Sequence, residues 1–504
     1  MPPNIIMFLT DQLRRDALGC YGNQVCRTPH LDQLAGEGSV FENAFTTSPV
    51  CSPARASLLT GLYPHTHGVM LNTHIAPAWS KGLPPEVPTF SRILQEAGYA
   101  LDYVGKWHVH QEWGPEKFGF ARHLSPRCPR QVVPGTELTV EFPGGSQLVG
   151  GASALPAEEH RTWKLTDTAI ALLEERSRGD AVPVGLLAPA AEGQPQERRR
   201  TPALRPERPR GSRPFFLRVD TDAPHFPNIV PEPYASLYSP SAIPPWPNFK
   251  ESFVGKPAGH LRKHREWHLE AKGWDWWARV VAKYYGDVSL IDSCVGRLLG
   301  AVRQCGLEAN TVFLFSADHG GKHWTSLPHR AERVPARGGH NWSSPGSLFG
   351  SPPASGWRAP ATARTASPSY HASLEPLDLM PTLVELAGAE LPQPVEGRSL
   401  VPLLRGEEPA DWPDSVYCEH HGASTGQACP TERSECPPGA GRRGRARGAF
   451  SAPLSQRLGR LWRPTTPWSS LTTSTNCTTS RLTRASCGST VAPARKAGTR
   501  WAPA

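Results

Sequence analysis

Continuous apolar segments of strand length alternate with amphipathic helical segments along most of the first 390 residues. The strand-like runs are NIIMFLT, ALDYVGKW, PFFLRVD and TVFLFSA, and the helical segments among them include VPTFSRILQEAGY and LTDTAIALLEERS. Strands that are apolar on both faces and joined through helices are typical of a parallel sheet covered on each side. The pattern therefore predicts an α/β fold over residues 1–390, with a mostly parallel central sheet sandwiched by helices.

Three segments interrupt this pattern: residues 179–213, 322–370 and 421–504. Each is rich in Arg, Pro, Ser, Gly and Ala, and none shows a strand or helix period. Such a composition buries too little apolar surface to offset the entropy lost on ordering. We expect two low-complexity insertions and a disordered basic tail. For the second and third segments, an alternative is out-of-frame translation of a GC-rich gene, which sequencing of the DNA would test.

The positive charge of the chain lies in that tail. The formal net charge is +9, and residues 421–504 contribute +11 of it, from twelve Arg and one Lys against two Glu, which leaves −2 for residues 1–420. An Arg-rich tail without interleaved aromatic residues is weak evidence for nucleic-acid binding, so nucleic acid is not the expected partner. No apolar run approaches the roughly 18 residues of a membrane helix, and the N-terminus lacks signal-peptide features. We therefore expect a cytoplasmic protein without membrane contact.

The segment VCSPARASLLTGLYPHTHGV contains the most informative cysteine. Pro53 suits the first turn of a helix and Gly61 suits its end, so Cys51 is expected at a helix N-terminus. The free N–H groups and the dipole at that position favour an anion such as sulfate or phosphate, and Arg55 adds donors. A single cysteine in a helix is more often an ordinary core residue. The neighbouring motifs must decide between these two interpretations.

Polar residues follow two of the predicted strands. Asp11 comes directly after NIIMFLT, and Asp318 and His319 come directly after TVFLFSA. Sheets of the α/β class bind ligands at the carboxyl ends of their parallel strands, which makes these residues candidates for a site. Without further information, an aspartate after a strand is more often a turn or helix-cap residue.

Together these segments resemble the signature of the sulfatases in the alkaline phosphatase superfamily. CSPAR with LLTG, GKWH and ADHG occur in the family's order, as do NIIMFLTDQLRRDALGCYG, PFFLRVDTDAPHFP and YYGDVSLIDSCVGRLL. The resemblance covers residues 4–125, 161–178, 214–320 and 374 to about 420. It implies an alkaline phosphatase-like fold with a smaller C-terminal α+β domain that starts at residues 391–420. The strand SVYCEHH has no visible successor, so we expect this small domain to be incomplete.

The resemblance also implies a nucleophile and a metal. In the family a separate formylglycine-generating enzyme oxidises the cysteine of C-x-P-x-R, so Cys51 is expected to become formylglycine, whose hydrate attacks sulfur and then expels sulfate. Asp11, Asp318 and His319 are expected to hold one divalent cation together with the formylglycine oxygen. Gln12 stands where many relatives carry a second aspartate, and its amide oxygen can still bind the metal. Calcium is the expected ion, and a histidine ligand also tolerates manganese.

Four further residues match the substrate site of the family. Lys106 and His108 of GKWH correspond to a cationic pair that binds sulfate and assists the leaving group. His225 of DAPHFP corresponds to a candidate general acid, and Asn72 to an active-site asparagine. The other nearby histidines are interpreted as structural: His65, His67 and His110.

These inferences predict a metal-dependent sulfate ester hydrolase that acts on a small sulfated substrate. Two alternatives remain open. The pair Asp11-Gln12 is more similar to the branch of choline sulfatases and phosphonate monoester hydrolases, so a phosphonate monoester or phosphodiester hydrolase is the second hypothesis. The family usually supplies another lysine after Asp-His-Gly, and this sequence has none between Lys322 and Lys496. A catalytically impaired protein is therefore the third hypothesis.

Overall fold

The fold is taken from a computed structural model. It describes residues 2–75, 81–142, 144–178, 213–246, 249, 261, 264–320, 348–350, 369–407, 409–413, 415–421 and 477–483. The chain divides into two units, Met1–His421 with Thr478–Ala504, and Gly422–Cys477. Nearly all of the second unit lies outside the described residues. The expectations for residues 179–212, 321–347 and 351–368 also lie outside them.

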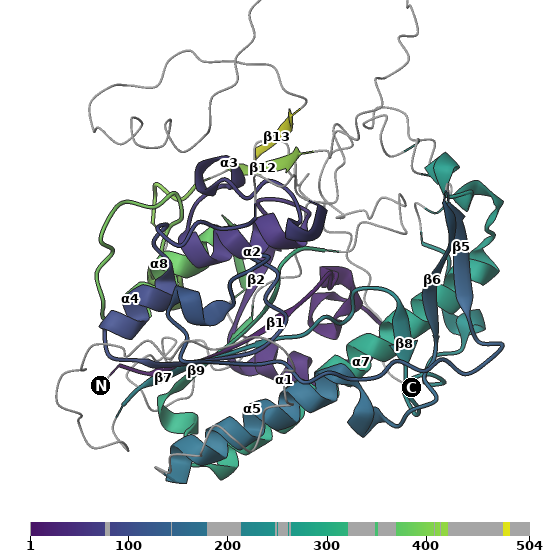
Figure 1. Ribbon diagram of the computed structural model, residues 1–504, viewed down its shortest axis with the longest axis horizontal. Helices are drawn as coiled ribbons and strands as arrows, with labels where there is room; N and C mark the ends of the chain where they lie inside the picture. Colours follow the sequence, from purple (N-terminus) through teal and green to yellow (C-terminus); the bar gives the residue numbers. More distant parts are fainter. Residues whose placement is uncertain are drawn as a thin grey trace, which may run out of the picture. The chain divides into compact units, whose positions relative to one another are not determined.

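An eight-stranded sheet forms the centre of the first unit (Figure 1). Its strands, from one edge to the other, are β11 (Ser369–Leu374), β2 (Ser39–Ala44), β10 (Leu348–Gly350), β9 (Thr311–Ala317), β1 (Asn4–Thr10), β7 (Phe215–Asp220), β3 (Ala100–Gly105) and β4 (Arg122–Leu124). All neighbouring pairs are parallel except those of β10, which runs antiparallel to both β2 and β9. The predicted mostly parallel sheet is confirmed.

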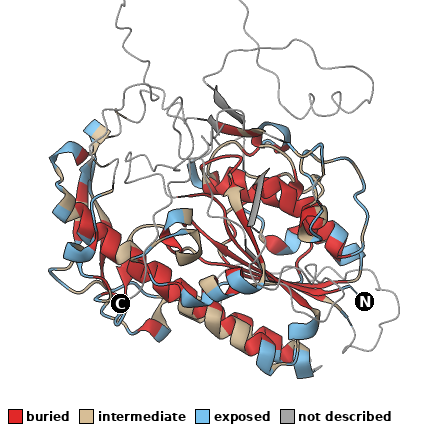
Figure 2. Cartoon of the chain, turned by 180° about the vertical axis from the view of Figure 1, so that it is seen from behind, coloured by how far each residue is buried: buried red, intermediate tan, exposed pale blue. Residues whose placement is uncertain are grey.

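Helices cover both faces of this sheet. The helices of one face are α1 (Pro29–Glu37), α5 (Arg161–Arg178) and α7 (Trp274–Gln304), and those of the other are α2 (Cys51–Thr60), α4 (Phe90–Glu96), α8 (Leu379–Leu386) and α9 (Val401–Leu404). The side chains of β1 alternate between the two faces of the sheet, so this strand contributes to the core on both sides. Ile6 and Phe8 pack with the first group of helices, and Ile5, Met7 and Leu9 pack with the second. Buried residues accordingly line the sheet and the inner helix faces (Figure 2).

Two smaller sheets accompany the central one. The first contains β5 (Leu138–Phe142), β6 (Gly145–Ala152) and β8 (Asn228–Val230), and the second pairs β12 (Ser415–His421) with β13 (Cys477–Thr483). The prediction that SVYCEHH has no successor strand is therefore wrong. Its partner β13 comes from the region predicted to be a disordered tail, where the lack of sequence period gave no sign of a strand. A short helix, α3 (Pro64–His67), lies between α2 and α4 in the chain.

Strand register gathers four polar residues at one edge of the central sheet. Thr10 pairs with Ala317, and both Leu9 and Gly105 pair with Asp220. The residues after these strand ends, Asp11, Asp318 and Lys106, therefore emerge beside Asp220. Gly105 allows the close approach, since its φ is +107° and a Cβ there would lie 2.0 Å from the Asp220 carbonyl oxygen.

Within the described part of the chain, no helix is both long enough and apolar enough to cross a bilayer.

Candidate active site

Cys51 is the first residue of α2. The helix ends at Gly61, which adopts the left-handed conformation with φ of 68° and donates its N–H to the Ser57 carbonyl. Both helix boundaries are those predicted from Pro53 and Gly61. Every residue of α2 is buried, and Cys51 is only 4% exposed. The helix thus points its N-terminal cysteine into the edge of the sheet where the strand ends converge.

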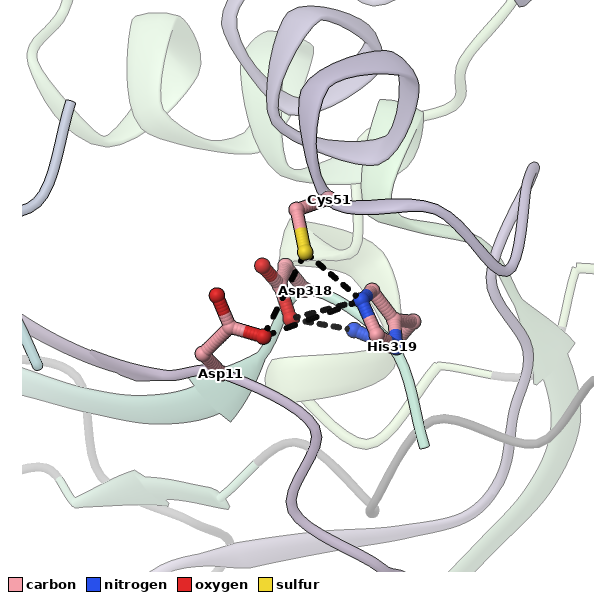
Figure 3. A group of neighbouring side chains, drawn as sticks. All are labelled: Asp11, Cys51, Asp318 and His319. Carbon is pink, nitrogen blue, oxygen red and sulfur yellow. Dashed lines mark hydrogen bonds and ion pairs between the residues drawn. The ribbon is translucent and has the colours of Figure 1, made fainter. Parts of the chain in front are cut away.

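Three other side chains meet Cys51 there (Figure 3). The Cys51 Sγ lies 3.1 Å from His319 Nε2 and 3.4 Å from Asp11 Oδ1. His319 Nε2 is 3.8 Å from Asp318 Oδ1. One ligand atom from each of the four lies within 4.8 Å of all the others. Because calcium–oxygen distances are about 2.3–2.6 Å, ligands of one ion can stand about 5 Å apart, so a single divalent cation fits this set.

His319 presents the correct nitrogen to this centre. Its Nδ1–H donates to the Gly320 carbonyl at 2.9 Å, which leaves the Nε2 lone pair directed toward Cys51 and Asp11. A metal-binding histidine is commonly oriented by such a bond from its second nitrogen.

Gln12 supplies a further test of the metal hypothesis. Its backbone φ is 65°, an uncommon value for a residue with a side chain, and its N–H donates to Asp318 Oδ1 at 3.3 Å. The amide nitrogen of its side chain is buried and has no hydrogen-bond partner among the described residues. An amide N–H donates and cannot bind a cation, so only the side-chain oxygen of Gln12 could contribute to a metal site. The fit of a divalent cation rests on Asp11, Cys51, Asp318 and His319.

Arg55 and Lys106 balance the charge of the acidic residues. Arg55 is completely buried; its Nε donates to Asp318 Oδ2 and its Nη1 to Asp220 Oδ2, each at 2.8 Å, and its Nη2 lies 3.6 Å from Asp11 Oδ2. The Lys106 Nζ donates to Asp11 Oδ2. Each of the three aspartates is thus paired with a cation that is held in a fixed position.

These charges set the protonation states. Burial alone would raise the pKa of Asp11, but Lys106, His225 and Arg55 together lower it below the ordinary value, so the carboxylate is ionised. Burial, followed by the charge of Asp11, raises the pKa of the Cys51 thiol well above its usual value. The thiol is therefore neutral, unlike the activated thiolate of a cysteine nucleophile.

Sequence reasoning missed a buried group that holds Arg55. Asp220 accepts hydrogen bonds from Tyr103 Oη at 2.6 Å and from Arg218 Nε and Nη2 at 2.8 and 2.9 Å, in addition to Arg55. Tyr103, Arg218 and Asp220 are all 0% exposed. Asp220 ends the strand PFFLRVD as Asp11 follows NIIMFLT, so the same strand-end argument could have identified it.

The remaining predicted residues stand around this centre. Asn72 Oδ1 accepts the N–H of Ser52 at 3.0 Å, next to Cys51 in the chain. His108 has a left-handed backbone, with φ of 55°, and contacts His74. His225 Nδ1 donates to the Phe226 carbonyl at 2.7 Å, which fixes its tautomer. Burial lowers the pKa of both His108 and His225.

The three histidines interpreted as structural make contacts of that kind. His67 bonds Ser57 Oγ at 3.1 Å and accepts the Val69 N–H at 3.1 Å, and burial lowers its pKa to about 3. His65 Nδ1 lies 2.9 Å from a carboxylate oxygen of Glu419, and His110 Nδ1 accepts backbone N–H groups of its own loop.

Comparison with known proteins places this arrangement in a family. The Sulfatase family model matches residues 3–389, and the model for the C-terminal part of N-sulphoglucosamine sulphohydrolase matches residues 358–430. The chain belongs to the sulfatase family. Similar proteins include the steryl-sulfatase of Mus musculus, 32% identical, and the arylsulfatase of Clostridium perfringens, 29% identical, each over 446 residues. The alignments cover 81% and 83% of this chain and 65% and 82% of those relatives, so the chain spans just under two thirds of the mouse protein.

Solved structures with the same fold are also similar to this chain. The phosphonate monoester hydrolase of Agrobacterium radiobacter aligns with a TM-score of 0.59 and 22% identity, over 84% of this chain and 82% of that one. A protein solved in complex with its substrate D-glucosamine-2-N,6-O-disulfate aligns with a TM-score of 0.57 and 19% identity, over 84% and 85%. These likenesses confirm the predicted alkaline phosphatase-like fold. The family and the named relatives indicate a sulfuric ester hydrolase, with the metal and formylglycine that the family implies.

Proposed function

We propose that this sulfatase-family chain hydrolyses the ester of a small sulfated substrate, and that a formylglycine made from Cys51 is its nucleophile. The observation that supports this most directly is the convergence of Asp11, Asp318 and His319 on the buried Cys51, with one ligand atom of each within 4.8 Å of the others. The neutral, buried thiol is itself poorly suited to attack, whereas an aldehyde hydrate at the same position has two hydroxyl groups for attack and release.

The residues of the chain divide the remaining tasks. Arg55 and Lys106, both fixed by aspartates, place positive charge beside Cys51, where the sulfuryl oxygens of a substrate would bind. His108 and His225 are the proposed groups for substrate binding and proton transfer to the leaving oxygen, and Asn72 orients the first turn of α2. These roles follow the family motifs.

Asp11, Gln12, Asp318, His319 and the modified Cys51 would hold the cation. When bound, this ion would polarise the nucleophile and neutralise negative charge on the substrate. We propose calcium, because the set is dominated by oxygen donors, and manganese is the alternative that His319 would accept. A formylglycine-generating enzyme is the proposed modifying partner.

The first experiment is to produce the chain together with a formylglycine-generating enzyme and to analyse the peptide containing Cys51 by mass spectrometry. We expect conversion of the thiol to an aldehyde, a loss of roughly 18 Da, and hydrolysis of 4-nitrophenyl sulfate by the converted protein. Metal analysis should show one calcium ion per chain. A Cys51→Ala variant should keep its fold and have no activity.

Full conversion without hydrolysis of any sulfate ester would contradict the proposal and support an impaired protein. The missing lysine after Asp-His-Gly would then be the first residue to restore, and its region lies outside the described residues.

A second candidate is hydrolysis of phosphonate monoesters or phosphodiesters by the same site. Gln12 favours it, because an amide in place of a second carboxylate leaves the centre one negative charge poorer. A matched panel of aryl sulfates and aryl phosphodiesters separates the two candidates. A preference of a hundredfold for phosphodiesters, about 2.7 kcal/mol of transition-state binding, would replace the first proposal by the second.

A further inference from the structure

Two histidines are hydrogen-bonded to each other beside the candidate active site. His74 lies in the short 3₁₀ helix η3 (Thr73–Ile75) and is exposed, whereas His108 lies in the loop after β3 and is partly buried. His74 Nδ1 is 3.0 Å from His108 Nε2, the ring planes differ by 15°, and the ring centroids are 5.2 Å apart. The centroid distance exceeds the nitrogen distance by about the width of one imidazole ring. The rings are therefore side by side in one plane, as an N–H···N hydrogen bond requires.

Both histidines are held in place by contacts to the site. The N–H of Thr73 donates to Ser52 Oγ at 3.2 Å, and Gln111 Nε2 donates to the Thr73 carbonyl. The first bond ties η3 to the residue after Cys51, and the second ties it to the loop that contains His108. The left-handed backbone of His108 persists inside this framework, and such uncommon conformations cluster at functional sites.

The second nitrogen of His108 is available on the opposite side of its ring. Its Nδ1 is buried and has no hydrogen-bond partner within the described parts of the chain. Burial lowers the pKa of His108 to about 3, together with the positive charges of Lys106 and Arg55 and a small effect of His74. The charge of Asp11 opposes this shift but does not cancel it. His108 is thus neutral near pH 7. A neutral imidazole can donate a proton from one nitrogen only if the other nitrogen receives one.

We propose that His74 relays a proton from solvent to His108, and through His108 to the oxygen of the leaving group. The inference rests on the proposed sulfate ester hydrolysis. As the S–O bond of the ester breaks, its electron pair passes to the leaving oxygen, which takes the proton from His108 Nδ1. His108 Nε2 takes the proton from His74 Nδ1, and water protonates His74 Nε2. Both imidazoles end neutral with their tautomers exchanged, and the net change is one proton taken from solvent.

Aryl sulfates with different leaving groups test the relay. 4-Nitrophenolate is stable without a proton, whereas the leaving group of phenyl sulfate requires one. In His74→Gln, the side chain can still hydrogen-bond His108 but cannot pass on a proton. We expect this variant to lose roughly tenfold or more in kcat for phenyl sulfate and less than twofold for 4-nitrophenyl sulfate. His74→Ala should behave in the same way, and added imidazole should restore part of its activity. His30→Ala, which removes an exposed histidine on the other layer of the fold, is the matched control.

The outcomes separate this inference from the proposed function. If the wild-type chain hydrolyses no sulfate ester, the proposed function fails before the relay is tested kinetically. If His74→Gln keeps wild-type activity on both substrates, or loses activity equally on both, the relay is wrong and His74 is at most a positioning residue. Histidine-selective ¹⁵N NMR gives a readout independent of activity. We expect the signal of His108 Nε2 to be that of an acceptor in the wild type and to change in His74→Ala; an Nε2–H tautomer of His108 in the wild type would overturn the proposed direction of transfer.

Discussion

At the scale of single residues, the site depends on the carboxylate of Asp220, which balances the charge of two buried arginines. Its two oxygens accept hydrogen bonds from Arg55, Arg218 and Tyr103, and all three of these side chains are fully buried. Removing one partner from a buried ionic group costs far more than removing one from an exposed pair, because the remaining charge stays desolvated.

Asp220→Asn should therefore lower the free energy of unfolding by about 3–5 kcal/mol, measured by chemical denaturation. It should also lower kcat, because Arg55 loses one of the carboxylates that fix it. The matched control is Asp167→Asn, which breaks the ion pair between Asp167 and Arg297. This pair is partly exposed: 44% of the Asp167 side chain and 33% of the Arg297 side chain are accessible to solvent. That change should cost under about 1 kcal/mol and leave activity intact. Equal costs for the two variants would contradict the assigned role of Asp220.

At the scale of elements, the α1–α7 contact shows a helix start held by a carboxylate from another helix. Asp292 of α7 accepts the N–H groups of Leu31 at 2.8 Å and His30 at 3.3 Å, in the first turn of α1. Burial, with a smaller contribution from Asp32, raises the pKa of Asp292 to about 7 from an ordinary 3.8. The folded protein therefore binds this proton more tightly than the unfolded chain does.

The stabilising contribution of protonated Asp292 is fully present below pH 3.8 and is lost as the pH rises through about 7. We expect Asp292→Asn to remove this part of the pH dependence, at most about 4 kcal/mol between pH 4 and 7. The altered hydrogen bonds of the variant would shift its free energy of unfolding by the same amount at every pH, which leaves the slope against pH unaffected. Denaturant unfolding across this pH range measures the slope, and the exposed Asp275→Asn on the same helix is the control. Parallel pH profiles for wild type and Asp292→Asn would contradict the assigned pKa.

The sequence predicted most elements because their patterns are local. The runs around β1, β3, β7 and β9 are apolar on both faces, so each could be identified alone, and the parallel sheet places their polar successors at one edge. Pairing between β12 and β13 could not be predicted, since it joins segments separated by a long stretch without period. His74 was also missed, because a lone histidine carries no sequence signal until the fold places it against His108.

At the scale of the whole molecule, the proposed metal would join distant parts of the chain. Asp11 follows β1, Cys51 begins α2, and Asp318 and His319 follow β9. A ligand that binds only the folded arrangement stabilises all of it, by about 2.7 kcal/mol when its concentration is 100 times Kd.

We therefore expect a chelator to lower the thermal unfolding midpoint of the full-length protein and added calcium to restore it. Asp318→Asn should abolish the response to calcium, and Asp275→Asn should retain it. Differential scanning calorimetry measures these shifts independently of activity. An unfolding midpoint that ignores both chelator and calcium would argue against a calcium ion at this position.

The burial of α2 limits when the proposed oxidation of Cys51 could take place. A second enzyme that oxidises the thiol must surround it with its own active site, yet all ten residues from Cys51 to Thr60 are buried and the cysteine itself is 4% exposed. The sheet edge that encloses it is complete only when residues beyond His319 have been synthesised. The proposed conversion would therefore take place after this segment emerges from the ribosome and before the chain folds around it, so the rates of translation and folding would set the fraction of molecules that become active.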